Sequence, residues 1–375
     1  MNMRTVRKIF IFSLLIGGSF LFLIPLVWMI STSLKPLDQT TTLPPTWIPY
    51  RLYAPSGGHI EEVRRGDSIE IPSCVVEAGG TRRVVALDAI VDGKTSDRSI
   101  DGTEIMVPAR ILEDIPASRE APWTKVTRLD APREAWTVMP ISNLVKKAAP
   151  RWENYALAIK TMNHFPRYLL NTLILCALTV TGTVLSSALA AYGFSRVRWR
   201  GRNKVFMLAL ATMMIPGQVT MVPIYSLFCW LGMVGTMQPL WVGSFCAGAF
   251  NVFLLRQFFM TIPLDLSEAA RIDGCSEFRI FWQIIMPLCR PALTVVGLFT
   301  FMGTWNDFMG PLMYLTDEKD FTLALGLQFF QSQHGGSEWH YLMAASTLIA
   351  MPLIILFFFT QKTFIEGISM TGLKG

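Results

Sequence analysis

Charged residues and histidines are scarce in this 375-residue sequence. Charged residues make up 16% of the chain, whereas a soluble globular protein has about 25%. Only four His are present, and neither an HExxH nor a GxSxG motif occurs. The six Cys include no CxxC pair, so neither a zinc site nor a disulfide framework is supported. The sequence therefore predicts no metal, no cofactor and no catalytic constellation, and it disfavours a plain cytosolic enzyme.

Apolar residues dominate what remains. They form 51% of the chain and include 20 Met, 25 Phe and 11 Trp. A soluble protein of this size would have difficulty burying so much apolar surface, and the same composition excludes disorder and collagen. The sequence therefore indicates a membrane protein.

One segment differs from the rest in charge. Residues 32–167 hold 18 basic and 17 acidic residues, whereas the other 239 residues hold 15 basic and 10 acidic. The segment is nearly neutral, which argues against a nucleic-acid surface. We therefore expect a soluble block inside a membrane protein, with no nucleic-acid partner.

Six apolar runs are long enough to cross a bilayer core, which needs about 20 apolar residues. The first run, Ile9–Ile30, follows three basic residues. A cleaved signal peptide is the alternative, but its apolar region is only about 7–15 residues long, so an uncleaved span is favoured. The other five expected spans are Leu169–Phe194, Val205–Trp230, Pro239–Met260, Pro291–Leu315 and Tyr341–Thr360.

Two of these runs have informative internal residues. The third contains Pro216 and Pro223, and a kink there requires neighbouring helices that satisfy the freed carbonyl groups. The second has small residues at four-residue spacing, which favour close approach of another helix; chance in an Ala/Ser-rich run is the alternative. These small residues are Gly182, Ser186 and Ala190.

Basic residues beside the spans predict the orientation of the chain. With the N-terminus inside, the inner segments contain 14 basic residues and the two short outer loops contain only Lys319. Cytoplasmic segments carry an excess of Lys and Arg. We therefore expect six spans, both termini in the cytoplasm, and residues about 32–167 outside.

Residues 51–150 have the pattern of strands. Short β-prone runs occur at Ser68–Ile71, Val84–Ile90 and Thr103–Val107, and pairs of turn residues separate them. Such pairs favour tight hairpins because they accept positive φ. They are Gly79-Gly80, Asp92-Gly93 and Asp101-Gly102. One small β-domain is expected.

The loop between the fourth and fifth spans has a distinctive pattern. Asp265 is expected to cap a short helix, with Glu268 three residues later completing a capping box. Gly274 suits the left-handed conformation that ends a helix. A second helix is expected to start at Ser276 and stop at Pro287, with one apolar face. That face comprises Phe278, Phe281, Trp282 and Ile285. An ordinary interfacial hairpin without a partner is the alternative.

The same loop resembles the EAA loop of ABC-importer permease subunits. The spacing of Glu268-Ala269-Ala270, Gly274, Ile284 and Pro287 matches that motif, with Met286 where the family usually has Leu. The resemblance implies that the loop, at about 261–290, docks on a separate ATPase and transmits its motion. The implied coupling residues are Glu268, Ala269, Ala270, Asp273, Gly274 and Pro287.

Other stretches resemble carbohydrate permeases of this family, most closely the maltose-type second permease. They are Trp47–Pro49, Trp152–Tyr155, Arg167–Thr172, Trp305–Phe308, Thr322–Leu327 and Gly367–Gly375. The resemblance covers residues 1–50 and 151–375, with the latter as a five-helix core. It implies an all-α polytopic membrane protein with six transmembrane helices, the type I ABC importer permease fold. The block at 51–150 departs from it and is expected to be a small extracytoplasmic all-β insert between the first and second spans.

The resemblance also implies partners and a function. Such permeases form a heterodimer with a second permease subunit, sit on two cytoplasmic ABC ATPase subunits and receive solute from an extracytoplasmic solute-binding protein. They are multi-pass proteins of the bacterial cytoplasmic (inner) membrane and contact membrane lipid. The implied function is import of a sugar or oligosaccharide by alternating access. The chain itself is then not an enzyme, because ATP is hydrolysed in a partner subunit.

Two polar residues, Asn306 and Asp307, lie late in the fifth expected span. Polar groups within a membrane are costly and are therefore functional candidates. Together with Trp305 and Phe308 they suit a sugar path, with an aromatic face for the ring and polar groups for the hydroxyls. The alternative is that they form hydrogen bonds with a neighbouring helix.

Two further functions stay open at this point. The same class of importer also carries glycerol-phosphate-type and other polar solutes. A membrane-anchored sensor with an outer ligand-binding β-domain is the alternative from a different class, although a sensor is expected to carry a cytoplasmic output domain. Neither the solute nor the role of the insert follows from the sequence.

Overall fold

The computed structural model divides the chain into two compact units. The helical unit comprises Met1–Ser33 and Trp152–Gly375, and the strand unit comprises Leu34–Arg151. The residues described are 3–40, 45–56, 59–69, 73–78, 81–86, 90–91, 94–98, 104–108, 110–115, 123–128, 137–140, 144–162, 164–333 and 338–372.

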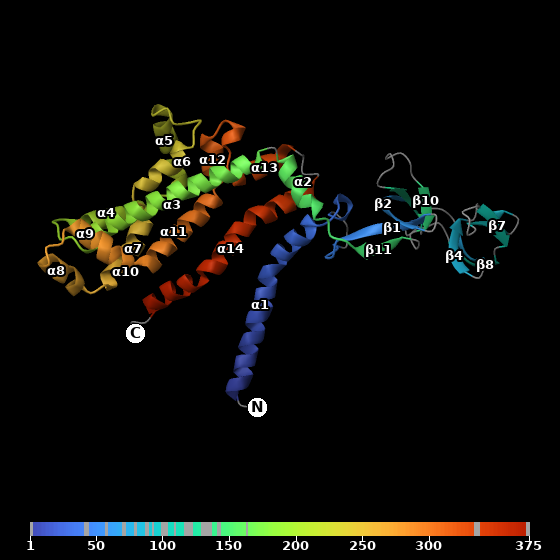
Figure 1. The fold of residues 1–375 in the computed structure, drawn as a ribbon, viewed down its shortest axis with the longest axis horizontal. Helices are drawn as coiled ribbons and strands as arrows, with labels where there is room; N and C mark the ends of the chain where they lie inside the picture. The colour runs from blue at the N-terminus through green and yellow to red at the C-terminus, as the bar shows by residue number, and fades with distance from the viewer. Residues whose placement is uncertain are drawn as a thin grey trace. The chain divides into compact units, whose positions relative to one another are not determined.

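The helical unit is organised around α3. Its longer helices are α1 (Met3–Ser33), α3 (Phe165–Ser195), α5 (Gly217–Trp230), α7 (Ala249–Thr261), α11 (Arg290–Trp305) and α14 (Trp339–Gly372). The shorter ones are α2 (Glu153–Thr161), α4 (Arg202–Thr212), α6 (Gln238–Val242), α8 (Leu264–Ile272), α9 (Glu277–Ile280), α10 (Met286–Leu288), α12 (Met309–Tyr314) and α13 (Leu323–Gln333). Helix α3 packs against both α7 and α11, and α14 packs against α1 and α11 (Figure 1).

Four helices in the described residues are long and apolar enough to cross a membrane. They are Phe10–Ser33, Phe165–Ser195, Gln238–Thr261 and Trp339–Gln361. Two bent pairs of helices qualify if each pair is one span: α4 with α5, bent by 97°, and Glu277–Leu288 with α11, bent by 80°. The chain is therefore a polytopic helical membrane protein with four to six candidate spans.

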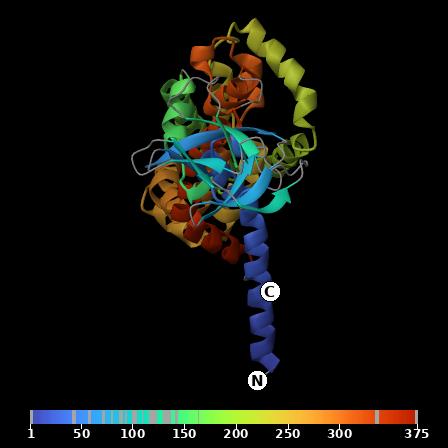
Figure 2. The ribbon, with the colours of Figure 1, turned by 90° about the vertical axis from the view of Figure 1, so that its right-hand side faces the viewer.

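The third expected span, Val205–Trp230, is not one continuous helix. Helix α4 ends at Thr212 and α5 starts after Pro216, whose ψ of 133° is extended. The break falls at Pro216, because proline readily starts a helix but cannot continue one, and Pro223 is accommodated inside α5. All residues of α5 are half-buried or exposed, and the helix lies at the periphery of its unit (Figure 2), where its Tyr225 and Phe228 rings contact Tyr314 of α12.

The fifth expected span, Pro291–Leu315, is also interrupted. Helix α11 ends at Trp305 and α12 begins at Met309. Between them, the Asp307 carboxylate accepts a hydrogen bond from the Gly310 amide at 3.1 Å. This interaction supplies an acceptor for an amide at the start of α12, which explains why the polar residues end one helix and begin another.

Among the described residues, two buried apolar clusters hold the helical unit together, and α3 contributes to both. The first includes Ala188, Phe206, Leu255, Phe259, Ile280 and Val296, and the second includes Tyr168, Cys176, Trp305, Leu323 and Ala344. Small residues on α3 permit close packing, as expected from their spacing. A side chain at Gly182 would lie 2.7 Å from the Phe245 ring, and Ser186 Oγ donates to Ser244 O at 3.0 Å.

The described residues of the strand unit form three antiparallel sheets. The largest has the order β10-β9-β2-β1-β11, with β1 (Tyr50–Ser56), β2 (His59–Ile69), β9 (Trp123–Arg128), β10 (Thr137–Pro140) and β11 (Val145–Ala148). The second, β4-β3-β8, comprises β3 (Ser73–Ala78), β4 (Thr81–Ala86) and β8 (Arg110–Ile115). The third, β5-β6-β7, comprises β5 (Ile90–Val91), β6 (Lys94–Arg98) and β7 (Glu104–Pro108).

The expected turn pairs at Gly79-Gly80, Asp92-Gly93 and Asp101-Gly102 lie outside the described residues, as do the last three residues of Gly367–Gly375. The strands on either side of each turn pair are antiparallel, with Ala78 opposite Thr81 and Val91 opposite Lys94.

The two ends of the strand unit lie side by side. Strands β1 and β11 pair with Tyr50 opposite Ala148, and the Arg151 amide donates to Leu34 O at 3.0 Å. The chain therefore enters and leaves this unit at one place.

Candidate functional site

The 261–290 loop begins with α8, and the expected cap of this helix is wrong. Helix α8 starts at Leu264, its N-cap is Pro263, and no side chain caps it. Proline lacks an amide hydrogen and has a φ suited to a helix start, so it moves the start ahead of Asp265. Asp265 instead lies in the first turn, where its negative charge interacts favourably with the helix dipole. The expected capping box with Glu268 is not formed.

The end of α8 agrees with the expectation for Gly274. This glycine has a φ of +80°, the left-handed conformation. The Asp273 amide donates to Ala269 O at 3.0 Å, and the Cys275 amide donates to Ala270 O at 2.9 Å. These two bonds satisfy carbonyl groups that a helix end otherwise leaves without partners. Four of the expected coupling residues thus form one helix terminus.

The second helix begins as expected but does not form a single apolar face. Ser276 Oγ accepts from the Arg279 amide at 3.3 Å, which caps α9. Residues Phe281–Ile285 form a π-helical turn, η5, which shifts side chains away from the 3.6-residue period. Consequently Phe281 and Ile285 are buried, whereas Phe278 and Trp282 are 68% and 52% exposed. Pro287 does not end the helix, which continues to Leu288 before the chain bends.

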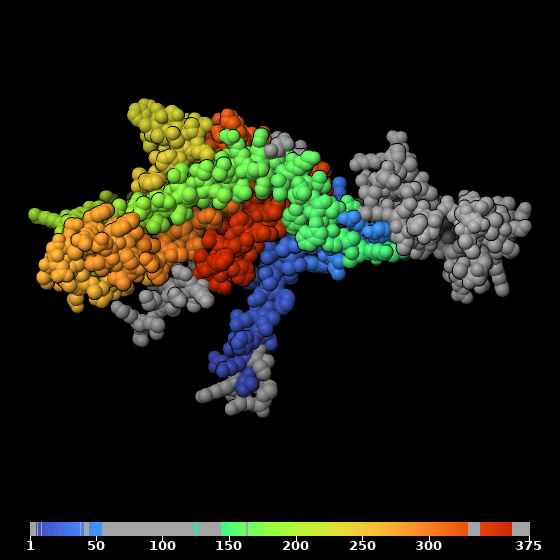
Figure 3. Space-filling model, in the orientation of Figure 1, coloured from blue at the N-terminus to red at the C-terminus, as the bar shows by residue number. Residues whose placement is uncertain are grey.

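Most of the predicted coupling residues are accessible on the loop. Glu268, Ala269, Asp273, Gly274 and Pro287 are exposed, whereas Ala270 is buried against the helical core. Large apolar side chains are exposed around them, namely Leu264, Leu266, Ile272, Phe278 and Trp282. The loop, orange in Figure 3, covers one end of the helical unit. It therefore presents a mixed apolar and charged surface, because Arg271 and Arg279 are exposed beside the acidic residues.

Glu277 connects both short helices of the loop to α3. Its carboxylate accepts from Tyr192 Oη at 2.6 Å and from Arg271 Nε at 2.7 Å. These residues come from α3, α8 and α9, and we call them the Glu277 network. The Glu277 carboxylate raises the pKa of Arg271. Sequence reasoning missed this network, because its members are far apart in the chain and have no motif in common.

Arg196, at the end of α3, holds the point where the loop begins. Its side chain is buried and Nη2 donates to the carbonyls of Phe259 and Ile262 at the end of α7. Burial lowers the pKa of this guanidinium. A cation is stabilised by the partial negative charge at a helix C-terminus. Helix α3 therefore contacts the loop near its start, through Arg196, and further along it, through Glu277.

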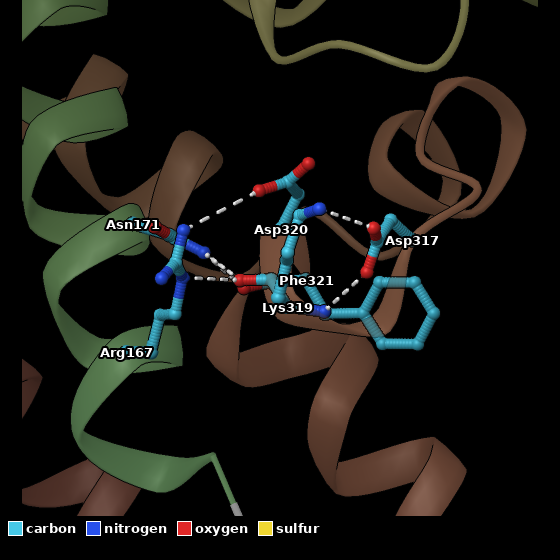
Figure 4. A network of polar contacts seen from close by, with 6 residues as sticks. All are labelled: Arg167, Asn171, Asp317, Lys319, Asp320 and Phe321. Carbon is cyan, nitrogen blue, oxygen red and sulfur yellow. Dashed lines mark hydrogen bonds and ion pairs between the residues drawn. The ribbon is translucent and has the colours of Figure 1, made fainter.

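A second polar cluster lies at the opposite end of α3 (Figure 4). Arg167 Nε and Asn171 Nδ2 both donate to Lys319 O at 3.0 Å, and Asn171 also donates to Phe321 O at 3.1 Å. Lys319 Nζ lies 2.6 Å from Asp317 Oδ2, and this contact lowers the pKa of the Asp317 carboxyl.

Two sequence stretches that resembled carbohydrate permeases separately therefore meet in space. Arg167–Thr172 contacts the segment leading into Thr322–Leu327, where the Leu323 amide donates to Thr172 Oγ1 at 2.9 Å. A side chain at Gly326 would lie 2.4 Å from the Tyr168 ring. Only glycine allows this approach.

The four residues expected to line a sugar path have mainly local interactions. Trp305 is buried and its Nε1 donates to Ile349 O at 3.1 Å. Asn306 is exposed and donates to Met302 O of its own helix at 2.9 Å. Asp307 caps α12, and Phe308 packs against the second apolar cluster. The alternative expected Asn306 and Asp307 to bond with a neighbouring helix or the outer gate, whereas Asn306 bonds within α11 and Asp307 bonds with Gly310 of the following helix α12. In the described part of the chain no group of three or more His, Cys, Asp or Glu side chains is placed to hold a metal.

Comparisons with known proteins identify the family of the chain. The profile of the family described as "Binding-protein-dependent transport system inner membrane component" matches residues 182–369. The arabinooligosaccharides transport system permease protein AraQ of Bacillus subtilis is 33% identical over 224 residues, which cover 60% of this chain and 79% of that protein. The trehalose/maltose transport system permease protein MalG of Thermococcus litoralis is 36% identical over 227 residues, which cover 60% of this chain and 81% of that protein.

One solved structure has a similar fold. It comes from a bacterial ABC transporter involved in the import of the acidic polysaccharide alginate, with a TM-score of 0.60 and 18% sequence identity. The match covers 96% of this chain and 98% of that chain, so it includes most of the strand unit.

Proposed function

Because the chain belongs to the family of binding-protein-dependent transport system inner membrane components, we propose that it is the membrane-spanning subunit of an ATP-driven importer of a sugar or oligosaccharide. Relatives with carbohydrate import in their names support the solute class. The protein is a transporter permease, and the family's ATPase is a separate subunit. Membership of this transporter family argues against the alternative function, a membrane-anchored sensor.

The observation that carries the proposal is the rigid 261–290 loop. Its two helices are capped at Gly274 and Ser276, connected by Glu277 and held to α3. A loop with these connections transmits force to a membrane helix, because little motion is lost in the loop itself. The exposed face with Glu268, Ala269 and Asp273 is the proposed contact for an ATPase.

The proposed assembly follows the implied partner set. Two ATPase subunits bind on the loop side of this chain and of a second permease, and a solute-binding protein delivers solute from the other side. Helix α5 supports the pairing of two permeases, since it lies at the periphery of its unit and all its residues are half-buried or exposed. The exposed Asn306 is the proposed solute contact among the four residues of the expected sugar path.

The proposed topology has six spans, with α4–α5 counted as one bent span and α11 with α12 as the fifth span, so that Glu277–Leu288 lies in the cytoplasmic loop. Both termini lie in the cytoplasm, and the strand unit is an extracytoplasmic all-β insert. The 14 basic residues of the inner segments support this orientation. A membrane-impermeant maleimide should label Ser56→Cys in intact spheroplasts when the six native cysteines are replaced by Ser, and labelling only after lysis would contradict the topology.

The function is tested on the importer complex purified through a tag on this chain and reconstituted into liposomes. Labelled oligosaccharide uptake and solute-stimulated ATP hydrolysis are measured for the native complex, for Glu268→Lys and for Lys160→Glu, a control charge reversal on α2. We expect the first variant to lose both activities and the control to keep them. Full ATP stimulation and uptake in Glu268→Lys would contradict the role of the loop, and uptake of only non-sugar solutes by the native complex would contradict the solute class.

A further inference from the structure

The loop that joins α3 to α4 forms an open surface cavity of about 340 Å³. Its lining includes three cations and no carboxylate. The lining residues are Arg198, Trp199, Gly201, Arg202, Asn203 and Lys204. A cavity with this charge is suited to an anionic group, because guanidinium and ammonium groups donate charge-assisted hydrogen bonds to phosphate oxygens.

Hydrogen bonds within the loop shape this cavity. Arg202 Nη1 donates to Val197 O at 3.2 Å, and Trp199 Nε1 donates to Gly193 O at 3.1 Å. Gly201 has a φ of +92°, which reverses the chain just before α4. Arg198 and Lys204 are exposed at the cavity. The lining is therefore organised partly by backbone contacts, while two cations are free to contact a bound molecule.

The apolar helices beside the cavity favour a lipid over a soluble anion as its ligand. The loop lies between the apolar helix Phe165–Ser195 and the apolar bent pair that starts with α4, so it is at the edge of the hydrocarbon layer. Immediately beyond the cavity, α4 exposes Val205, Met207 and Leu208, which are 45%, 68% and 68% accessible. A cationic cavity beside an exposed apolar helix face matches a molecule with an anionic head and acyl chains. The exposed Trp199 suits a position at the edge of the hydrocarbon layer, because Trp is enriched at membrane interfaces.

We propose that this cavity binds the phosphate group of an anionic phospholipid, whose acyl chains lie along the apolar face of α4. Arg198, Arg202 and Lys204 contact the phosphate, and Val205, Met207 and Leu208 contact the chains. The site is on the same end of α3 as the 261–290 loop, since the neighbouring Arg196 contacts the start of that loop. It is independent of the transported solute.

The test uses the purified full-length chain and native mass spectrometry to measure retained phosphatidylglycerol during titration. The variants are Arg198→Gln and Lys204→Gln, and the matched control is Arg200→Gln, on the same loop but outside the cavity lining. Each lining variant should weaken binding about fivefold, the change that corresponds to about 1 kcal/mol per juxtamembrane cation. The control should change binding less than about twofold. Circular dichroism and gel filtration verify that each variant is folded.

Two further titrations identify whether the bound phosphate belongs to a lipid or to a soluble anion. Inorganic phosphate and phosphatidylcholine are titrated under the same conditions, and neither should bind as tightly as phosphatidylglycerol. Equal losses in all three variants would show diffuse attraction to a basic loop and overturn the proposal. Binding of inorganic phosphate that depends on Arg198 and equals that of phosphatidylglycerol would assign the cavity to a soluble anion and also overturn it.

Discussion

Tyr192 of α3 donates a 2.6 Å hydrogen bond to the Glu277 carboxylate of α9, which joins two residues 85 positions apart. The same carboxylate accepts from Arg271 of α8. A change in the position of either short helix is therefore transmitted directly to α3. Since α3 also packs against α7 and α11, the Glu277 network connects the exposed loop with the centre of the helical unit.

Glu277→Gln is expected to reduce the coupling of ATP hydrolysis to uptake without preventing assembly. Loss of the charge weakens both hydrogen bonds, and a bond of this kind contributes about 1 kcal/mol or more. We expect solute-stimulated ATP hydrolysis to fall about fivefold in reconstituted complex. Tyr192→Phe should have a smaller effect of the same sign, and Tyr225→Phe, at a half-buried tyrosine of α5 outside the Glu277 network, is the control. Unchanged stimulation in Glu277→Gln would show that the network is dispensable.

Gly274→Ala tests the helix end separately from packing. No described atom lies within 4 Å of a side chain built at Gly274, but its φ is +80°. The expected destabilisation is therefore conformational, about 1 kcal/mol, and appears as a lower melting temperature and weaker ATPase coupling. Gly303→Ala is the matched control, because Gly303 also has open space in the described structure and no positive φ. Gly274→Pro, which fixes φ near about −65°, should abolish coupling altogether. Equal melting temperatures and equal ATPase coupling in Gly274→Ala and Gly303→Ala would contradict a conformational role for Gly274.

The local features of the loop were predictable because they depend on neighbouring residues. Gly274 and Ser276 end and begin helices by their own backbone and side-chain properties, and both predictions are confirmed. The cap at Asp265 was wrong because Pro263 starts the helix earlier. The apolar face was wrong in part because a π turn changes the period within Phe281–Ile285. Neither the earlier helix start set by Pro263 nor the π turn at Phe281–Ile285 can be recognised from a 3.6-residue apolar pattern.

Contacts between distant segments were not predictable from a single sequence. Arg167–Thr172 and Thr322–Leu327 are separate stretches in the sequence, and nothing in either predicts that Asn171 donates to Phe321 O. The breaks after Thr212 and Trp305 likewise interrupt runs that are long enough for single spans. Length and hydropathy identify apolar segments, whereas their bends depend on Pro216 and on the Asp307 cap.

Gly326→Ala is expected to destabilise the end of α3 that carries Arg167. The added methyl group would lie 2.4 Å from the Tyr168 ring, and overpacking of this kind costs about 1–3 kcal/mol. We expect a lower melting temperature of the purified complex. Tyr168→Leu combined with Gly326→Ala should recover part of the loss, because the smaller side chain leaves room. Gly303→Ala serves again as the control, and a melting temperature for Gly326→Ala equal to that control would contradict the close approach.

Replacement of residues 52–149 by a short Gly/Ser linker is expected to leave the helical unit assembled. Tyr50 and Ala148 are paired across β1 and β11, and such partners are about 4.5–5.5 Å apart, so a short linker closes the gap.

The helical unit also holds the junction by its own contacts. Asn154 Nδ2 donates to Ser33 O at 2.8 Å, and the hydroxyl groups of Tyr155 and Ser33 are hydrogen-bonded at 2.8 Å. These bonds join α1 to α2 without any residue of the strand unit.

The measurements are co-purification with the ATPase subunits, solute-stimulated ATP hydrolysis and affinity for the solute-binding protein. We expect assembly and ATP coupling to persist while affinity for the binding protein falls. The control is the same deletion with Asn154→Ala, which removes a junction contact and should lower the stability of the deletion variant more than that of the intact chain. A deletion complex that assembles and docks the binding protein normally, yet transports no solute, would show instead that the strand unit belongs to the transport pathway.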